Sequence, residues 1–302
     1  MYSQSLRTVS ARRAITPRRA PLFAALLGVA ATVAGCPGPT MTGDNTNDMA
    51  TAAPDMATPP KFGLLRIAST SFQAGTATIN GSAATAVFVD PAQQGAACQK
   101  QTQGECTLYY CEGASFTSPH SGAITIAGGT QSVALNPRAD GSYEPFVNTS
   151  MNVFPSGQAL SLTAAGQTVP AFTGNITPMG SGTPFALTMP DGSRANILFT
   201  VSKSQDYQVT WTPLAGGSKV AAELVQSPDS NRSLTLECIF DGARGNGTFP
   251  STLLNRFQST NGQLGVGAFL AGPATTTTVK QGAWEISVTS ISGGRAGSAT
   301  LQ

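Results

Sequence analysis

This sequence contains few charged side chains and a single histidine. Charged residues make up 11% of its 302 residues, whereas typical soluble domains carry about 25%. This composition excludes a coiled coil and a charged disordered tail, because both depend on a high density of charge. The chain also lacks the basic stripe that binds nucleic acid. With His120 as the only histidine, no two-histidine metal site can form within one chain.

The N-terminal segment lacks an apolar run long enough to span a bilayer. Its arginines precede an apolar run of about 13 residues, from Pro21 to Val33, whereas a transmembrane helix needs about twenty. A basic start, a short apolar run and small residues after it are typical of a secretory signal peptide. We therefore predict that residues 1–35 are a signal peptide.

The end of this segment, Val33-Ala34-Gly35-Cys36, resembles the lipobox of bacterial lipoproteins. The resemblance implies cleavage before Cys36 and a membrane anchor made of acyl chains on that residue, since two or more chains hold a protein stably at a bilayer. Pro37 stands where an aspartate retains related lipoproteins at the inner membrane, so the resemblance implies an outer-membrane location. It leaves open whether the body faces the periplasm or the cell surface. An ordinary cleaved signal followed by a chance cysteine is the alternative.

Composition also divides the rest of the chain. Residues 36–60 are rich in Pro, Thr, Asp and Asn, and such a segment cannot bury enough apolar surface to offset its ordering entropy. We therefore predict a disordered tether. For the folded body we predict two β-sandwich units, residues 61–178 and 179–302, which meet at a run rich in proline and glycine. One continuous body over residues 61–302 is the alternative.

After residue 60, apolar and polar side chains alternate with the period of two that is typical of β-strands. Residues 207–211, 234–240 and 284–288 show this pattern, and Asp-Gly or Asn-Gly pairs, which are typical of hairpin turns, lie between such runs. We therefore predict an all-β protein, an antiparallel β-sandwich whose outward faces carry Thr, Ser and Gln. Glu237 and Glu285 are expected on these hydrated faces.

One short helix is predicted at residues 250–257, because proline is common at helix starts and the apolar residues that follow it form one stripe. The order of elements in the second half resembles secreted immunoglobulin-like or fibronectin-like sandwich modules, and the body resembles bacterial surface lipoproteins that carry such modules. This resemblance covers about 120 residues. It implies two packed immunoglobulin-like units and no activity.

Besides Cys36, the chain contains four cysteines: Cys98, Cys106, Cys111 and Cys238. An even number in an exported chain favours disulfides over a zinc site. Every complete pairing links Cys238 to the first half of the body. Cys106 and Cys111 are five positions apart, so on one strand they face opposite sides. Of the three possible connectivities we favour Cys98–Cys106 with Cys111–Cys238.

His120 is the one candidate for general acid–base catalysis. It would need an orienting carboxylate, for which Asp90 or Asp140 is available, and an activated nucleophile. The sequence contains no Gly-x-Ser-x-Gly elbow, and its glycine-rich runs do not match phosphate-binding motifs. We therefore expect a histidine in a surface turn, no catalytic residue, no metal and no cofactor.

Four aromatic side chains are candidates for a face that binds a glycan or a peptide: Tyr109, Tyr110, Phe116 and Tyr143. Packing within the core is the competing interpretation. The two differ in whether a contiguous exposed patch exists, because isolated apolar residues on a surface carry little information.

These observations predict a lipid-anchored envelope protein with a structural or interaction role and no catalysis. The first alternative is a binding module for a glycan, a peptide or another envelope protein. A hydrolase with an unrecognised site is the more distant alternative. The membrane is the only partner that the sequence identifies, through the lipid on Cys36, and nucleic acid is not expected.

Overall fold

The computed structural model describes residues 61–74, 77–94, 98–112, 118–180, 185–191, 197–229, 232–260 and 267–302. The predicted signal peptide, Cys36 and the predicted tether lie outside these ranges. The described part of the chain is an all-β sandwich, as predicted from the alternation of its sequence.

The largest sheet has ten strands, in the order β3-β4-β14-β13-β16-β17-β1-β2-β7 with β11 beside β17. In chain order these strands are β1 (Lys61–Ala74), β2 (Ala77–Val89), β3 (Cys98–Gln103), β4 (Cys106–Glu112), β7 (Phe146–Asn148), β11 (Ile197–Val201), β13 (Lys219–Asp229), β14 (Arg232–Asp241), β16 (Gly267–Gln281) and β17 (Trp284–Leu301).

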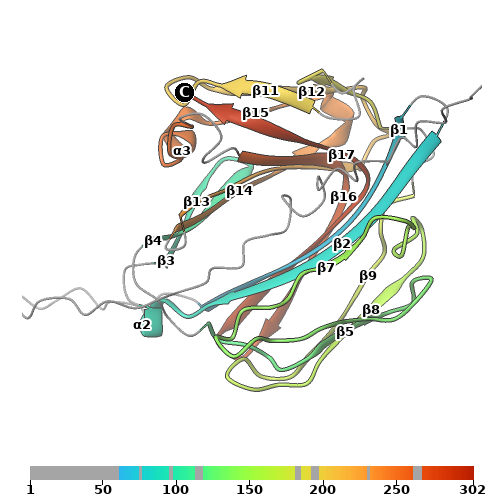
Figure 1. Ribbon diagram of the computed structural model, residues 1–302, viewed down its shortest axis with the longest axis vertical. Coiled ribbons are helices and arrows are strands. Elements are labelled where there is room, and N and C mark those ends of the chain that lie inside the picture. The colour runs from blue at the N-terminus through green and yellow to red at the C-terminus, as the bar shows by residue number, and fades with distance from the viewer. Residues whose placement is uncertain are drawn as a thin grey trace, which may run out of the picture.

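Two smaller sheets accompany the large one. A four-stranded sheet contains β6 (Val133–Leu135), β5 (Ile124–Ala127), β8 (Leu160–Ala164) and β9 (Phe172–Ile176), and a three-stranded sheet contains β10 (Leu187–Met189), β12 (Tyr207–Trp211) and β15 (Asn246–Phe249). Figure 1 shows the large sheet between them, with the three-stranded sheet above it and the four-stranded sheet below.

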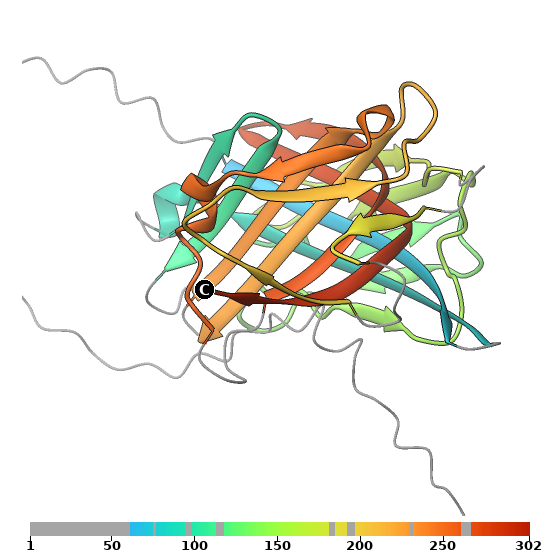
Figure 2. The same ribbon diagram turned by 90° about the horizontal axis from the view of Figure 1, so that it is seen from above.

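The large sheet bends so strongly that its two halves face each other. Seen from above in Figure 2, β13 and β14 in one half run at a steep angle to β1 and β2 in the other. The rings of Phe62 in β1 and Tyr109 in β4 lie 5.4 Å apart, although four strands separate β1 from β4 in the sheet. The bend therefore creates an inner face, shared by both halves, and an outer face on each half.

Each outer face packs against one small sheet and forms its own hydrophobic core. One core lies between the three-stranded sheet and the half containing β13 and β14, and includes Trp211, Leu236 and Phe240. The other lies between the four-stranded sheet and the half containing β1 and β2, and includes Phe88 and Leu162. A fully buried side chain of this kind contributes about 1.5–3 kcal/mol to folding.

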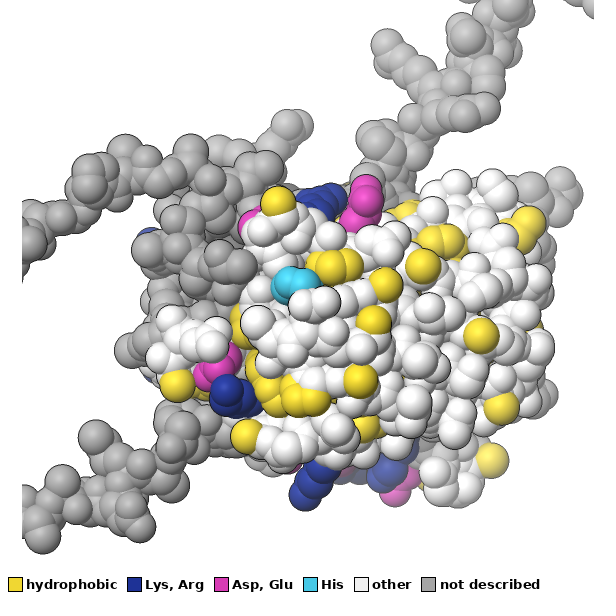
Figure 3. Space-filling model, turned by 90° about the horizontal axis from the view of Figure 1, so that it is seen from below, with side chains coloured by type: hydrophobic (Ala, Val, Ile, Leu, Met, Phe, Trp, Pro, Cys, Tyr) yellow, Lys and Arg dark blue, Asp and Glu magenta, His cyan; other side chains and the backbone are white. Residues whose placement is uncertain are grey.

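The exposed side of the four-stranded sheet carries few charges (Figure 3).

The predicted alternation of β14 is confirmed, but one residue of its second face, Glu237, is buried. Leu234, Leu236 and Phe240 are buried in the core beside the three-stranded sheet. Glu237 points to the inner face of the bent sheet and is only 5% exposed, so the expectation that it lies on a wet face was wrong. The sequence pattern distinguishes the two faces of a strand, but the bend of the sheet decides what covers them. Glu285, in contrast, keeps about half of its side chain exposed.

Two strand pairs are parallel rather than antiparallel. β1 runs parallel to β17 from Lys61↔Trp284 to Thr70↔Gly294, and β11 runs parallel to β17 from Ile197 to Val201. The first strand of the body thus lies beside the last. In addition, β4 pairs with β14, so the large sheet takes strands from both of the ranges 61–178 and 179–302.

The predicted short helix is present as α3 (Ser251–Leu254). Pro250 precedes it. Leu253 and Leu254 are fully buried in the core beside the three-stranded sheet, together with Phe257 beyond the end of the helix. The other helical segments within the described ranges are α2 (Pro91–Gln94) and the 3-10 turn η2 (Gly242–Arg244). Among the described residues, no helix has the length and apolarity needed to cross a membrane.

All four cysteines of the body form disulfides, but not in the pairing that we favoured. The bonds are Cys98–Cys111 and Cys106–Cys238. The physical reason is strand register, because Cys98 lies directly opposite Cys111 in the β3–β4 hairpin, and Cys106 opposite Cys238 in the β4–β14 pair. Cys106 and Cys111 do take different partners, and Cys238 is linked to the first half, as the spacing required.

Candidate functional site

The inner face of the bent sheet encloses a cavity of about 140 Å³. Strands β1, β2, β13, β14, β16 and β17 supply its walls. Small and apolar side chains dominate them, including Leu64, Ala68, Val225 and Leu270. The cavity reaches solvent near Val87, whose side chain is about half exposed. It is thus a partly open, largely apolar site.

Three charged side chains meet within this bend. Arg66 Nε lies 2.6 Å from Glu223 Oε1, and Arg66 Nη2 lies 2.9 Å from Glu237 Oε2. Arg66 comes from β1, whereas the two glutamates come from β13 and β14 in the opposite half of the sheet. The cluster therefore connects the two halves across the interior, and Arg66 and Glu223 themselves line the cavity.

Strand register explains how these residues come together. Glu223 and Glu237 are direct cross-strand neighbours in the β13–β14 pair, an arrangement in which like charges repel. Arg66 lies between them and opposes both. Thr289, the register partner of Arg66 in β17, donates a hydrogen bond of 2.8 Å to Glu237 Oε1. Glu237 thus has two polar partners, whereas Arg66 is the polar partner that the structure gives Glu223.

Burial determines the electrostatics of the cluster. Burial raises the pKa of Glu223 to about 7, although Arg66 acts in the opposite direction. For Arg66, burial acts to lower the pKa, but Glu237 and Glu223 more than reverse this and hold it above the ordinary value. Burial also raises the pKa of the nearby Tyr109. Arg66 is therefore always charged, and Glu223 is the group of the cluster that changes its charge near neutral pH.

Two buried polar atoms on the cavity wall have neither a hydrogen bond nor an ion pair among the described residues. They are Nη1 of Arg66 and Oγ1 of Thr70. Both residues line the cavity from the same face of β1, four positions apart, and Thr70 is only 7% exposed. A buried polar group without a partner costs about 1–3 kcal/mol, so the cavity presents groups that a ligand could satisfy.

The four aromatic candidates do not share one exposed face. Tyr109 lies on the inner side of the sheet beside Phe62 and close to the charged cluster. Tyr110 is buried on the outer side of β4. Tyr143 is buried in the other core, where its hydroxyl accepts from the Ser121 N–H and donates to the Gly122 carbonyl. Phe116 lies outside the described residues.

The histidine lies in an irregular segment between β4 and β5 that hydrogen bonds hold in place. The His120 N–H donates to Thr168 Oγ1 at 2.8 Å, and His120 Nδ1 accepts from the Gly122 N–H at 3.2 Å. Within the described ranges, no group of three or more His, Cys, Asp or Glu side chains is arranged to hold a metal ion. The two hydrogen bonds therefore give His120 a local structural role.

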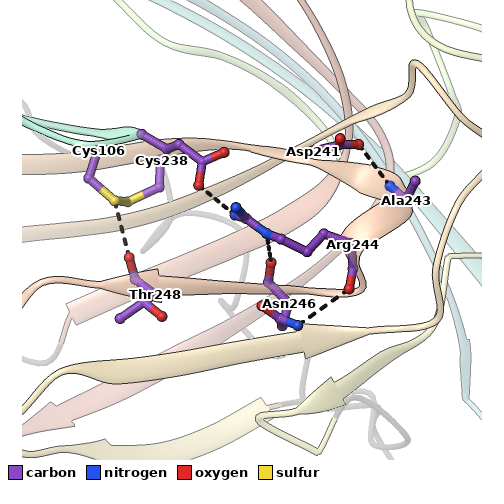
Figure 4. A network of polar contacts seen from close by, with 8 residues as sticks. Cys106, Cys238, Asp241, Ala243, Arg244, Asn246 and Thr248 are labelled. Atoms are coloured by element: carbon purple, nitrogen blue, oxygen red, sulfur yellow. Dashed lines mark hydrogen bonds and ion pairs between the residues drawn. A yellow bond between two sulfur atoms is a disulfide. The ribbon is translucent and has the colours of Figure 1, made fainter.

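A second polar cluster lies at the surface, where the β3–β4 turn meets β15 (Figure 4). Arg244 forms an ion pair with Glu105, donates from Nε to the Asn246 carbonyl at 3.0 Å, and has its guanidinium 5.8 Å from the centre of the Phe240 ring. Arg244 and Glu105 are each more than 40% exposed, and an exposed pair of this kind contributes at most about 1 kcal/mol. We interpret it as a surface contact that holds the turn.

The Cys106–Cys238 disulfide lies beside this surface cluster (Figure 4). Cys106 Sγ is 3.3 Å from the Thr248 carbonyl oxygen. This is a packing contact, because a disulfide sulfur carries no proton to donate. Both cysteines are almost completely buried, so the bond belongs to the core.

The sequence analysis did not identify the charged cluster of Arg66, Glu223 and Glu237, although the sequence contains two signals for it. Arg66 interrupts an apolar strand, Leu64-Leu65-Arg66-Ile67-Ala68, and Glu223 interrupts Val220-Ala221-Ala222-Glu223-Leu224-Val225. In a chain with so little charge, a single charged residue within an apolar strand indicates a buried charge with a partner. The identity of that partner depends on the bend of the sheet, which no local pattern contains.

In comparisons with known proteins, no protein-family model matches this chain, and no curated protein is similar to it in sequence.

Proposed function

We propose that this chain is a lipid-anchored envelope protein, not an enzyme, whose body binds a small ligand in the cavity of the bent sheet. The anchor would be the lipid on Cys36, with residues 36–60 as the tether and the outer membrane as the location. The proposal joins the predicted anchor to the first alternative for the body, a binding module.

The observation that carries the binding role is the set of buried charges on the cavity wall. A buried ion pair is often no more stable than apolar side chains of similar volume, so folding alone gives little reason to retain Arg66, Glu223 and Glu237. Thr70 lines the same cavity, and its buried Oγ1, which can accept a hydrogen bond, has no partner among the described residues. Largely apolar walls with a few convergent polar groups are the usual composition of a small-molecule site.

The binding role is tested by filling the cavity. Ala268 lines it from β16, so Ala268→Phe should occlude it, whereas Ala134→Phe on the exposed face of β6 is the matched control. Benzyl alcohol, benzylamine and benzoate, all of similar size, are titrated into the purified full chain by calorimetry. We expect at least one of them to bind the wild type and the control but not Ala268→Phe. Binding of none of the three would overturn the role.

The anchor is tested separately, by metabolic labelling with an alkyne fatty acid. We expect the label on the wild-type chain and its loss in the Cys36→Ala variant. A label that persists in both would contradict lipidation at Cys36, and would leave the binding experiment unaffected.

A further inference from the structure

We propose that the ligand of the cavity is a small organic ammonium ion, whose cationic head lies against Glu223 and whose apolar body lies along the cavity walls. This inference rests on the proposed binding function and names the chemical class of its ligand.

The charged cluster contains more negative than positive groups. One guanidinium faces two carboxylates, so the cluster carries a net charge of −1 whenever both glutamates are ionised. An uncompensated charge is expensive in a buried, apolar environment. Either a proton or a second cation must compensate it. The cavity is open to solvent on one side, so a cation from outside can reach it.

Glu223 is the carboxylate of the cluster that lines the cavity. Its carboxylate lines the cavity, whereas Glu237 does not line it and already accepts from Arg66 and Thr289. Glu223 is thus the less compensated carboxylate, and the accessible one. The charged and titratable groups near it are Arg66 from β1, Glu237 from β14 and Tyr109 from β4. Burial raises the pKa of Glu223 to about 7, so Glu223 can exchange its proton for a cation near neutral pH.

The chemistry of the walls selects the kind of cation. Calcium and magnesium ions need about six oxygen ligands, whereas these walls are mostly Ala, Leu and Val. A carboxylate ligand would raise the negative charge of the cluster. An ammonium group donates hydrogen bonds to Glu223, and its carbon body matches the walls. The cavity of about 140 Å³ is close to the roughly 150 Å³ of a cavity that holds benzene.

Benzylamine, benzyl alcohol and benzoate are therefore the probes, because they differ mainly in charge. The full chain is titrated with each by calorimetry from pH 5 to pH 8. At pH 8 we expect benzylamine to bind at least tenfold more tightly than benzyl alcohol, and benzoate to bind least. Benzylamine must displace the proton of Glu223, so its affinity should fall by about tenfold per pH unit below the pKa of Glu223. The affinity of benzyl alcohol should change little.

The matched variants are Glu223→Gln and Glu285→Gln. Both lie on inner-face strand positions, but Glu285 pairs with Lys100 at 3.5 Å and is about half exposed. We expect Glu223→Gln to lose the preference for benzylamine and its pH dependence while still binding benzyl alcohol. Glu285→Gln should behave as the wild type.

Each outcome bears on one proposal or on both. Equal binding of benzylamine and benzyl alcohol, or an unchanged preference in Glu223→Gln, overturns the ammonium ligand and leaves the binding function intact. Tighter binding of benzoate also overturns the ammonium ligand alone. If no probe binds, the binding function and the ammonium ligand both fail.

Discussion

At the scale of single residues, Arg66 has the largest electrostatic role inside the bent sheet. It opposes two glutamates that are direct neighbours on adjacent strands. Because Arg66 comes from one half of the sheet and the glutamates from the other, the strength of the cluster can be measured as the stability of the whole fold.

We predict that Arg66→Met destabilises the protein by about 3–5 kcal/mol, because it leaves two carboxylates buried without a counter-charge. The triple variant Arg66→Met, Glu223→Leu, Glu237→Leu should recover the wild-type stability or exceed it. Urea denaturation of each variant measures these differences. Lys100→Met removes a largely exposed pair with Glu285 and should cost less than about 1 kcal/mol. A similar loss in both single variants would contradict the buried role of Arg66.

Glu223 gives the protein a pH-dependent stability of a defined sign. Its pKa is raised from the ordinary 4.5 to about 7 in the folded state, so the folded chain binds its proton more tightly than the unfolded chain. This contribution is fully present below pH 4.5 and is lost as the pH rises through 7, with a magnitude of about 3 kcal/mol.

The measurement is the free energy of unfolding in urea between pH 4.5 and 8, for the wild type and Glu223→Gln. The difference between the two isolates Glu223 from the other carboxylates. We expect the wild type to lose stability relative to the variant as the pH rises. A difference that is constant over this range, or that grows in the opposite direction, refutes the assignment.

At the scale of elements, the two disulfides close loops of very different length. Cys106 and Cys238 are 132 residues apart, and Cys98 and Cys111 are 13 apart. In the chain-entropy model, closing the longer loop raises the free energy of the unfolded state by about 5 kcal/mol, and closing the shorter loop raises it by about 3 kcal/mol. We predict that Cys106→Ala with Cys238→Ala destabilises the protein more than Cys98→Ala with Cys111→Ala, as measured by urea unfolding. The reverse order would contradict this prediction.

Sequence periodicity predicted the strands because it reports a local property. The β12 pattern, the alternation of β14 and the buried stripe of α3 depend only on residues within a few positions of one another. The pairing of Cys106 with Cys238, the parallel β1–β17 pair and the burial of Glu237 depend on register between distant strands and on the bend of a ten-stranded sheet. These are contacts between distant segments, so the favoured disulfide pairing and the wet face of Glu237 were wrong for the same reason.

At the scale of the whole molecule, the bent sheet interlocks the two ends of the body. β1 lies between β2 and β17, and β4 pairs with β14, whose Cys238 forms a disulfide with Cys106. A cut between residues 178 and 179 would separate β1 from β17 and β4 from β14. It would also leave the cavity with one wall in each fragment.

We therefore predict that the fragments 61–178 and 179–302, expressed separately, do not fold cooperatively, whereas residues 61–302 do. Each fragment would expose unpaired strand edges and half of an apolar interior, and such edges promote aggregation. Near-ultraviolet circular dichroism and urea unfolding of the three chains test this. A mixture of the two fragments should recover the native signal in part, because the missing pairings then form between chains. Cooperative unfolding of either fragment alone would show that the two ranges are independent domains, and the cavity would then lie at an interface between them.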